Sequence, residues 1–208
     1  MAAPTLGGKS MATERAAKKS GDTGDLDYTG SHAFLFVDHV DPQAGTVRDV
    51  MMSIWKGEPF ANGSVLFAHD FVGPFLGFAH LRAEDLEGME KLVAELQGLG
   101  VRCALASEVG VYKSGTQLKG TKRSGCEIVG LVKIWTDGSP RKVVQSLGDD
   151  DLGGQFRGAS LVVGDFDVLL EVQDSTFGPL ARTVRKTVRR WPRVDRIEVG
   201  FADLRNET

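Results

Sequence analysis

Two histidines of this 208-residue chain fall where they could bind one metal ion. If Gly73-Pro74 forms a two-residue turn, the strands on either side pair so that Phe67 lies opposite His80 and Phe78 lies opposite His69. Imidazoles are common ligands of metal ions and of haem iron, so His69 and His80 are candidate ligands. No cysteine or carboxylate stands at ligand spacing beside them, and partly buried histidines with ordinary hydrogen bonds are therefore the favoured interpretation. The remaining histidines are His32 and His39.

A second candidate site is the turn Gly164-Asp165-Phe166-Asp167. Glycine at position 164 permits a tight turn with a positive φ, and Asp165 can accept hydrogen bonds from backbone amides in such a turn. Asp167 begins a strand that is otherwise apolar, so its carboxylate either contacts a ligand or caps the turn. Both interpretations stay open. A small-molecule ligand such as an amino acid would offer its carboxylate to the amides and its ammonium to Asp167.

Composition excludes several classes of function. The chain has 28 acidic and 25 basic residues, a net charge of −3, which does not suit a strongly basic nucleic-acid binder. No apolar run reaches the roughly 18 residues that cross a bilayer, and the N-terminus lacks the apolar segment of a signal peptide. We therefore expect a cytoplasmic protein without a membrane partner. The two cysteines, Cys103 and Cys126, indicate neither a disulfide framework nor a zinc finger, and no motif predicts a catalytic residue.

The apolar pattern predicts the element order β-α-β-β-α-β twice. Short apolar runs predict strands, and apolar residues three and four apart predict helices. The first unit has strands at 33–37, 64–72, 75–81 and 101–106 and helices near 47–54 and 86–96; the second has strands at 128–135, 156–163, 167–172 and 194–201 and helices near 140–147 and 177–188. Residues 71–75 also align with 162–166 at an offset of 91 residues, which indicates an internal repeat.

The repeat predicts an α+β fold of two tandem ferredoxin-like units that form an α+β barrel. We expect a disordered tail at 1–32, a first unit at 33–106, a linker at 107–126 and a second unit at 127–208. Two helices cover one face of each four-stranded sheet and leave the other face bare. The bare faces must meet each other or a partner chain, because soluble monomers avoid large exposed apolar patches. A homo-oligomer, a dimer or larger, is therefore expected.

Residues 162–172, Val-Val-Gly-Asp-Phe-Asp-Val-Leu-Leu-Glu-Val, form the most distinctive stretch of the second half. This hairpin resembles the effector-binding domain of the leucine-responsive regulator family (Lrp/AsnC), and residues 180–194 are compatible with that resemblance. The resemblance implies a dimeric α+β barrel with an effector beside the 164–167 turn. The first half is a degenerate copy, with Pro74 where the second half has Asp165. The first 32 residues are too few and too rich in glycine for the family's helix-turn-helix, so direct nucleic-acid binding is not expected.

These features support three functional hypotheses. The first is a non-enzymatic module of regulation or assembly that binds a small molecule, such as an amino acid, and needs no cofactor. The alternative is an enzyme on the same barrel, either haem-binding or a cofactor-free monooxygenase. Tandem ferredoxin-like haem proteins, such as the chlorite dismutase-like group, make haem an alternative, although their axial histidine lies in the later half, which here has no histidine. The third is a purely structural protein whose barrel only oligomerises.

Overall fold

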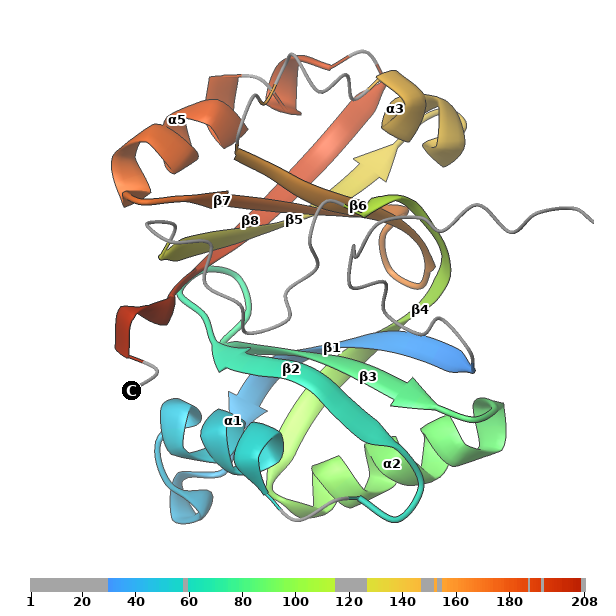
Figure 1. The fold of residues 1–208 in the computed structure, drawn as a ribbon, viewed down its shortest axis with the longest axis vertical. Coiled ribbons are helices and arrows are strands. Elements are labelled where there is room, and N and C mark those ends of the chain that lie inside the picture. Colours follow the sequence, from blue (N-terminus) through green and yellow to red (C-terminus); the bar gives the residue numbers. More distant parts are fainter. Residues whose placement is uncertain are drawn as a thin grey trace, which may run out of the picture.

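The chain folds into two β-α-β-β-α-β units (Figure 1). The computed structural model describes residues 30–57, 60–114, 127–146, 152, 155–186, 188–191 and 193–206. The first unit consists of β1 (Ser31–Val40), α1 (Val47–Lys56), β2 (Ser64–Asp70), β3 (Gly77–Ala83), α2 (Leu86–Gly98) and β4 (Val101–Ser114). The second consists of β5 (Ile128–Thr136), α3 (Pro140–Ser146), β6 (Phe156–Val163), β7 (Val168–Asp174), α5 (Phe177–Lys186) and β8 (Val194–Asp203). The predicted tandem ferredoxin-like α+β fold is confirmed.

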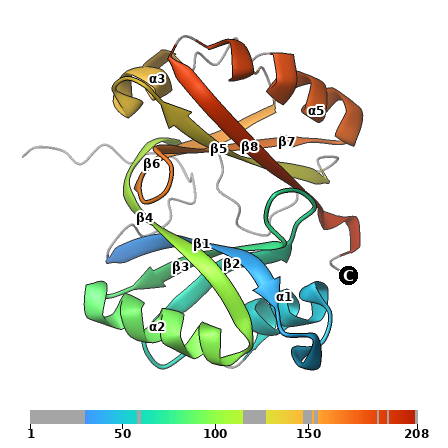
Figure 2. The same ribbon diagram turned by 180° about the vertical axis from the view of Figure 1, so that it is seen from behind.

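All eight strands form one antiparallel sheet in the order β2-β3-β1-β4-β6-β7-β5-β8. Each unit supplies four neighbouring strands, and β4 joins the units by pairing with β6. The sheet curls until its two halves face each other with the helices outside, as the views from both sides show (Figures 1 and 2). Away from the β4–β6 pairing, Val72 and Phe201 exchange backbone hydrogen bonds of 2.8 and 2.9 Å. The two inner sheet faces therefore cover each other within one chain.

Local signals fix where the helices begin. Helix α1 starts at a capping box, in which the Thr46 side chain accepts a hydrogen bond from the Asp49 amide and the Asp49 carboxylate accepts one from the Thr46 amide. Helix α2 starts at Asp85, whose carboxylate accepts a hydrogen bond from the Gly88 amide at 2.8 Å. None of the helices in the described part of the chain has the length and apolar composition that crossing a bilayer requires.

Successive strand residues point to opposite faces, so the sheet separates an inner core from two outer cores. The outer cores lie between each half-sheet and its helices; Leu35 and Leu92 belong to the first and Leu170 and Leu180 to the second. The inner core fills the barrel and consists mainly of aromatic and aliphatic side chains, among them Phe34, Phe36, Phe67, Phe71, Phe75, Phe78, Leu131, Phe166 and Leu169. Polar side chains among these rings are exceptions that call for an explanation.

The register of β2 and β3 is as predicted, with Phe67 opposite His80 and Phe78 opposite His69. The connection between these strands is longer than a two-residue turn. It spans Phe71 to Leu76 and is closed by a 2.8 Å hydrogen bond from the Phe71 amide to the Leu76 carbonyl. This bond preserves the register that a turn at Gly73-Pro74 would give.

Two boundaries differ from those expected. Strand β1 begins at Ser31, so His32 belongs to the first strand and not to a tail. Strand β4 runs on to Ser114 because residues 107–114 pair with β6, whereas the sequence suggested a linker from 107. The rest of the expected tail, 1–29, and of the expected linker, 115–126, lies outside the described residues.

Candidate metal centre

Two histidines from neighbouring strands meet inside the barrel. His32 on β1 shares the inward face with Phe34, two residues on. Strand β3 runs beside β1 with Phe34 opposite His80, which places His80 diagonally across from His32. The Nδ1 atom of His32 and the Nε2 atom of His80 are 3.1 Å apart, and both residues are buried.

Glu108 on β4 brings a carboxylate to this pair. Strand β4 lies on the other side of β1, with Ser107 opposite Ala33. The Glu108 side chain is only 4% exposed. Its Oε2 atom lies 3.9 Å from His32 Nδ1 and 3.7 Å from His80 Nε2, which is too far for a good hydrogen bond to either nitrogen.

These three separations have the dimensions of a metal site. A point equidistant from the two nitrogens and the oxygen lies about 2.1 Å from each of them, and bonds from zinc to imidazole nitrogen and carboxylate oxygen are about 2.0–2.2 Å. Four-coordinate geometry at such bond lengths separates neighbouring ligands by roughly 3.4 Å, close to the observed distances. The side chains of His32, His80 and Glu108, hereafter the His-His-Glu cluster, can therefore share one ion without rearranging the strands.

The surroundings of Glu108 lower the pKa of its carboxyl group. Burial tends to raise the pKa of Glu108, but polar contacts with His80 and Ser160 and the electrostatic influence of the His80 and His32 rings outweigh it, so the pKa lies below its ordinary value. Glu108 therefore carries its negative charge at neutral pH. An ionised carboxylate beside two imidazoles is the donor set that binds a divalent transition metal.

A second carboxyl group lies in the neighbourhood of Glu108. Burial, together with the negative charge of Glu108, raises the pKa of Glu171 on β7 to about 7, and the positive charge of Arg157 opposes the rise. Glu171 is therefore close to half-protonated at neutral pH. A group with this property can take up or release a proton near a reaction site.

The structure separates the two histidines that the strand register suggested as a pair. His80 belongs to the His-His-Glu cluster, whereas the His69 ring stacks on Phe67 and its Nδ1 lies 2.7 Å from the carbonyl oxygen of Asp70. His69 is buried but it contacts neither His32 nor Glu108 in any described interaction. It fits the interpretation of a histidine with ordinary hydrogen bonds.

The 164–167 turn lies on the second unit, and its polar groups are largely engaged. One Asp167 carboxylate oxygen accepts a 2.8 Å hydrogen bond from the Thr136 amide, and the Asp165 carbonyl accepts one from the indole of Trp135. Phe166 is buried in the inner core. The φ of Gly164 is not positive; glycine is needed there because a Cβ atom would lie 3.0 Å from the Ala106 Cβ. The expected positive φ is therefore wrong, and close packing of the turn against β4 is the reason for the glycine.

Haem does not fit the His-His-Glu cluster. Two histidines bound to one haem iron lie on opposite faces of the ring, with their nitrogens roughly 4 Å apart, whereas His32 and His80 are 3.1 Å apart with a carboxylate beside them. Binding through His80 alone would require the rings of Phe34 and His32 to move, since their centroids lie 4.9 and 5.3 Å from that of His80. The described residues accommodate a single ion better than a porphyrin.

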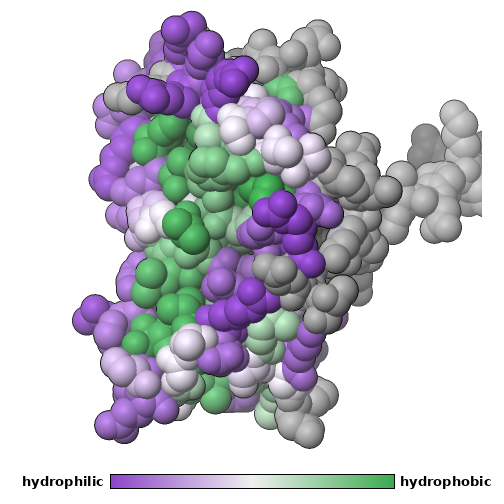
Figure 3. All heavy atoms as spheres, turned by 90° about the vertical axis from the view of Figure 1, so that its left-hand side faces the viewer, coloured by the Kyte–Doolittle hydropathy of each residue, from purple (hydrophilic) through white to green (hydrophobic). Residues whose placement is uncertain are grey.

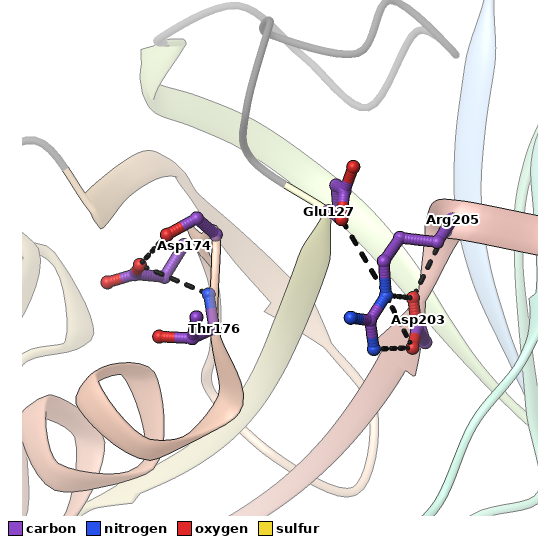
Figure 4. Close-up of polar contacts among 6 residues, drawn as sticks. Glu127, Asp174, Thr176, Asp203 and Arg205 are labelled. Atoms are coloured by element: carbon purple, nitrogen blue, oxygen red, sulfur yellow. Dashed lines mark hydrogen bonds and ion pairs between the residues drawn. The ribbon is translucent and has the colours of Figure 1, made fainter.

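A separate polar cluster near the end of β8 is structural. Arg205 forms an ion pair with Asp203 and lies 3.6 Å from Glu127, just before β5 (Figure 4). The Leu204 amide donates a 2.7 Å hydrogen bond to the Glu127 carbonyl in the same place. All three charged side chains are partly exposed to solvent, so they attach the last turn to β5 and form no enclosed site.

Comparisons with known proteins support the fold but identify neither a family nor a function. No protein-family model and no curated protein matches the sequence. Among solved structures, an anthrone oxidase-like protein superposes with a TM-score of 0.53 at 12% identity, covering 86% of this chain and 94% of that one. A mutant chlorite dismutase from Candidatus Nitrospira defluvii in complex with cyanide gives a TM-score of 0.49 at 13% identity, covering 85% and 92%. At these identities the likeness is one of fold alone.

Sequence reasoning missed His32 and Glu108 for identifiable reasons. The composition of residues 1–32 groups His32 with the tail, although it precedes Phe34 and Phe36 at the alternate positions that mark one strand face. Glu108 falls within the expected linker because the apolar run of β4 ends at Ala106. The ferredoxin-like strand order, which places β1 between β3 and β4, is the signal that would have brought His32, His80 and Glu108 together.

Proposed function

We propose that the protein is a metal-dependent enzyme in which the His-His-Glu cluster binds a divalent transition-metal ion, with zinc as the first expectation. The proposal rests on one observation: a single point lies about 2.1 Å from each of His32 Nδ1, His80 Nε2 and Glu108 Oε2, which is the length of a bond to zinc. A site with three protein ligands leaves a position for water or substrate, which is typical of catalytic sites, whereas structural zinc sites use four.

The surroundings of the cluster indicate what chemistry it could support. A bound zinc ion lowers the pKa of a water molecule and polarises a carbonyl or phosphoryl oxygen. Glu171, with its pKa raised to about 7, is the nearby group that would exchange a proton with such a water. The ring of Phe34 lies against His80, with the two ring centroids 4.9 Å apart, and gives the cluster an apolar neighbour. Hydrolysis or Lewis-acid chemistry on a small, largely apolar substrate is therefore the activity that these residues support best.

Metal binding by single variants tests the proposal. The chelator-treated protein is titrated with Zn²⁺, Fe²⁺ and Mn²⁺ by calorimetry. We expect one ion per chain, and His80→Ala and Glu108→Gln should each weaken binding by more than the roughly 10–100-fold that changes outside the ligand shell cost. The matched control is His69→Ala, a buried histidine outside the cluster, which should bind the ion as the parent does. Equal binding by all variants would refute the assignment.

The metal that binds best decides the reaction class within this proposal. Preference for zinc supports hydrolytic or Lewis-acid chemistry, whereas preference for iron supports chemistry with oxygen, because two histidines and one carboxylate also form the site of non-haem iron enzymes. A Soret band in the purified protein would support the haem alternative instead.

A regulatory module of the Lrp/AsnC type is the second candidate function. It would bind an amino acid beside Gly164, Asp165, Phe166 and Asp167 and would assemble as a homo-oligomer. The hydrogen bond between Asp167 and the Thr136 amide favours capping as the role of this carboxylate. A thermal-shift screen of amino acids tests the candidate, since a ligand that binds only the folded state raises the melting temperature.

A further inference from the structure

Lys133 on β5 carries its ammonium group into the barrel, where none of the described residues forms a hydrogen bond with it. The residue is 7% exposed, and no hydrogen bond or ion pair joins its Nζ to any other part of the described chain. Aromatic rings surround the nitrogen instead: it lies 4.0 Å from the centroid of Phe36, 5.2 Å from that of Phe75 and 5.5 Å from that of Phe166. Cation–π contacts recover part of the cost of burying a charge but leave its hydrogen-bonding capacity unused.

The position of Lys133 makes it independent of the His-His-Glu cluster. Its nearest ring, Phe36, stands four residues after His32 on β1, and strand residues rise about 3.3 Å each, so the two sites are roughly 13 Å apart along the strand. The 164–167 turn contributes Phe166 to the rings around Lys133. A residue that breaks the apolar pattern of a core without an evident structural partner is a candidate for function.

Charged groups beyond the rings show what kind of partner Lys133 can take. Asp38, Asp165 and Glu198 attract its ammonium group, and Arg196 repels it. Arg196 is itself paired with Glu198 and lies over the Trp135 ring at 4.5 Å. Three carboxylates and two cations leave the charges that act on one another here net negative. An anionic ligand would add to that excess, so a neutral partner fits better.

The amine is also shifted toward its reactive form. Burial is the largest cause that lowers the pKa of Lys133, and the charge of Arg196 acts in the same direction. A lysine that is desolvated and lies near another cation is the usual activated amine of imine-forming sites. A neutral carbonyl group is the partner that such an amine attacks.

We propose that Lys133 is a nucleophile that forms an imine with a neutral aldehyde or ketone whose apolar body lies against Phe36 and Phe166. The Nζ lone pair attacks the carbonyl carbon, and one proton moves from nitrogen to oxygen to give a carbinolamine. A second proton then passes from nitrogen to the hydroxyl group, the carbon–oxygen bond breaks as water leaves, and the carbon–nitrogen double bond of the imine forms. No electrons are gained or lost, so the step needs no redox partner. Asp165 and Glu198 are the neighbouring carboxylates that can carry the protons.

Reductive trapping of the imine tests this assignment on the full chain. The protein is incubated with benzaldehyde and cyanoborohydride at pH 7, and the benzylated lysines are identified by peptide mapping. Lys142, exposed on α3, is the reference lysine. We expect Lys133 to be benzylated faster than Lys142, because burial lowers the pKa of Lys133 and leaves more of it as the free amine. An unmodified Lys133 in a sample where Lys142 reacts, or equal rates at the two sites, would overturn the proposal.

Two controls keep the result interpretable. Lys133→Arg retains the positive charge but cannot form the imine, so the adduct at this position should vanish while the circular dichroism spectrum is unchanged. If that variant does not fold, the pH dependence in the parent protein decides: labelling of Lys133 should reach half its maximal rate at a lower pH than labelling of Lys142, and coincident profiles would contradict the proposal. His80→Ala should leave the labelling of Lys133 intact, which separates this site from the metal site.

Discussion

Replacing Glu171 by glutamine should stabilise the metal-free protein at high pH and leave it nearly unchanged at low pH. The folded state raises the pKa of this carboxyl from 4.5 to about 7, so the folded chain holds a proton that the unfolded chain releases. This contribution to stability is fully present below pH 4.5 and is lost as the pH rises through 7. The difference between the two pKa values corresponds to about 3 kcal/mol. Glutamine has nearly the same shape and no charge, so the variant should not show this loss.

The assay is urea unfolding of the parent and of Glu171→Gln at pH 5 and pH 8, with a chelator present. We expect the variant to gain up to about 3 kcal/mol over the parent at pH 8 and much less at pH 5. Glu87→Gln is the matched control: Glu87 is an exposed carboxylate on α2 that pairs with exposed Lys91, and an exposed ion pair contributes at most about 1 kcal/mol to stability. The same stability difference at both pH values would refute the argument that burial beside Glu108 sets the pKa of Glu171.

Three further substitutions test the fold. Thr46→Ala removes the capping box of α1 and should cost about 1 kcal/mol in urea unfolding; an unchanged midpoint would contradict the assigned cap. Gly200→Ala should destabilise by about 1–3 kcal/mol, because the new Cβ would lie 2.5 Å from a ring atom of Phe75. Gly178→Ala, on α5 with no atom within 4 Å of the new Cβ, should instead stabilise by up to about 1 kcal/mol. Equal effects of the two glycine substitutions on the melting temperature would show that packing inside the barrel is looser than described.

The element order could be predicted from the sequence because both periodicities are strong. The apolar stripe of α1 and the aromatic runs of β1 and β3 each point to one element type, and the hydrogen bond between Phe71 and Leu76 keeps the register that the turn predicted. The inner face is largely aromatic in the first unit, so alternation along β1, β2 and β3 is clear. Such periodicities involve residues that are close together in the sequence, so they can be read without knowledge of the fold.

The candidate site depends on contacts between strands that are far apart in the sequence. His32 and Glu108 are 76 positions apart and become neighbours only because β1 lies between β3 and β4. The extension of β4 past Ala106 arises from pairing with β6 of the other unit, and no local pattern in residues 107–114 indicates it. The environment of Lys133 could not be predicted for a different reason. Lys133 stands within an apolar run, and its contact with Phe36 forms only because the two half-sheets face each other.

The outer surface on the side of α5 offers another feature that only the folded chain reveals. Figure 3 shows apolar side chains gathered along this face between polar margins. A groove of about 620 Å³ lies between α5 and β8, where apolar residues such as Val184, Ile197 and Phe201 line it together with the charged residues Arg185, Asp195 and Arg196. Phe177, which is 54% exposed, contacts Phe201 beside it. The homo-oligomer expected from the sequence stays a prediction, and light scattering tests it directly.

The measurement that tests the central claim most directly is anomalous X-ray diffraction from crystals of the protein grown with Zn²⁺, recorded at the zinc absorption edge. The account predicts one strong peak inside the barrel, about 2.1 Å from His32 Nδ1, His80 Nε2 and Glu108 Oε2, and no such peak in crystals of Glu108→Gln. A parent crystal with no anomalous peak between these three side chains, or with zinc bound only to exposed residues, would contradict it.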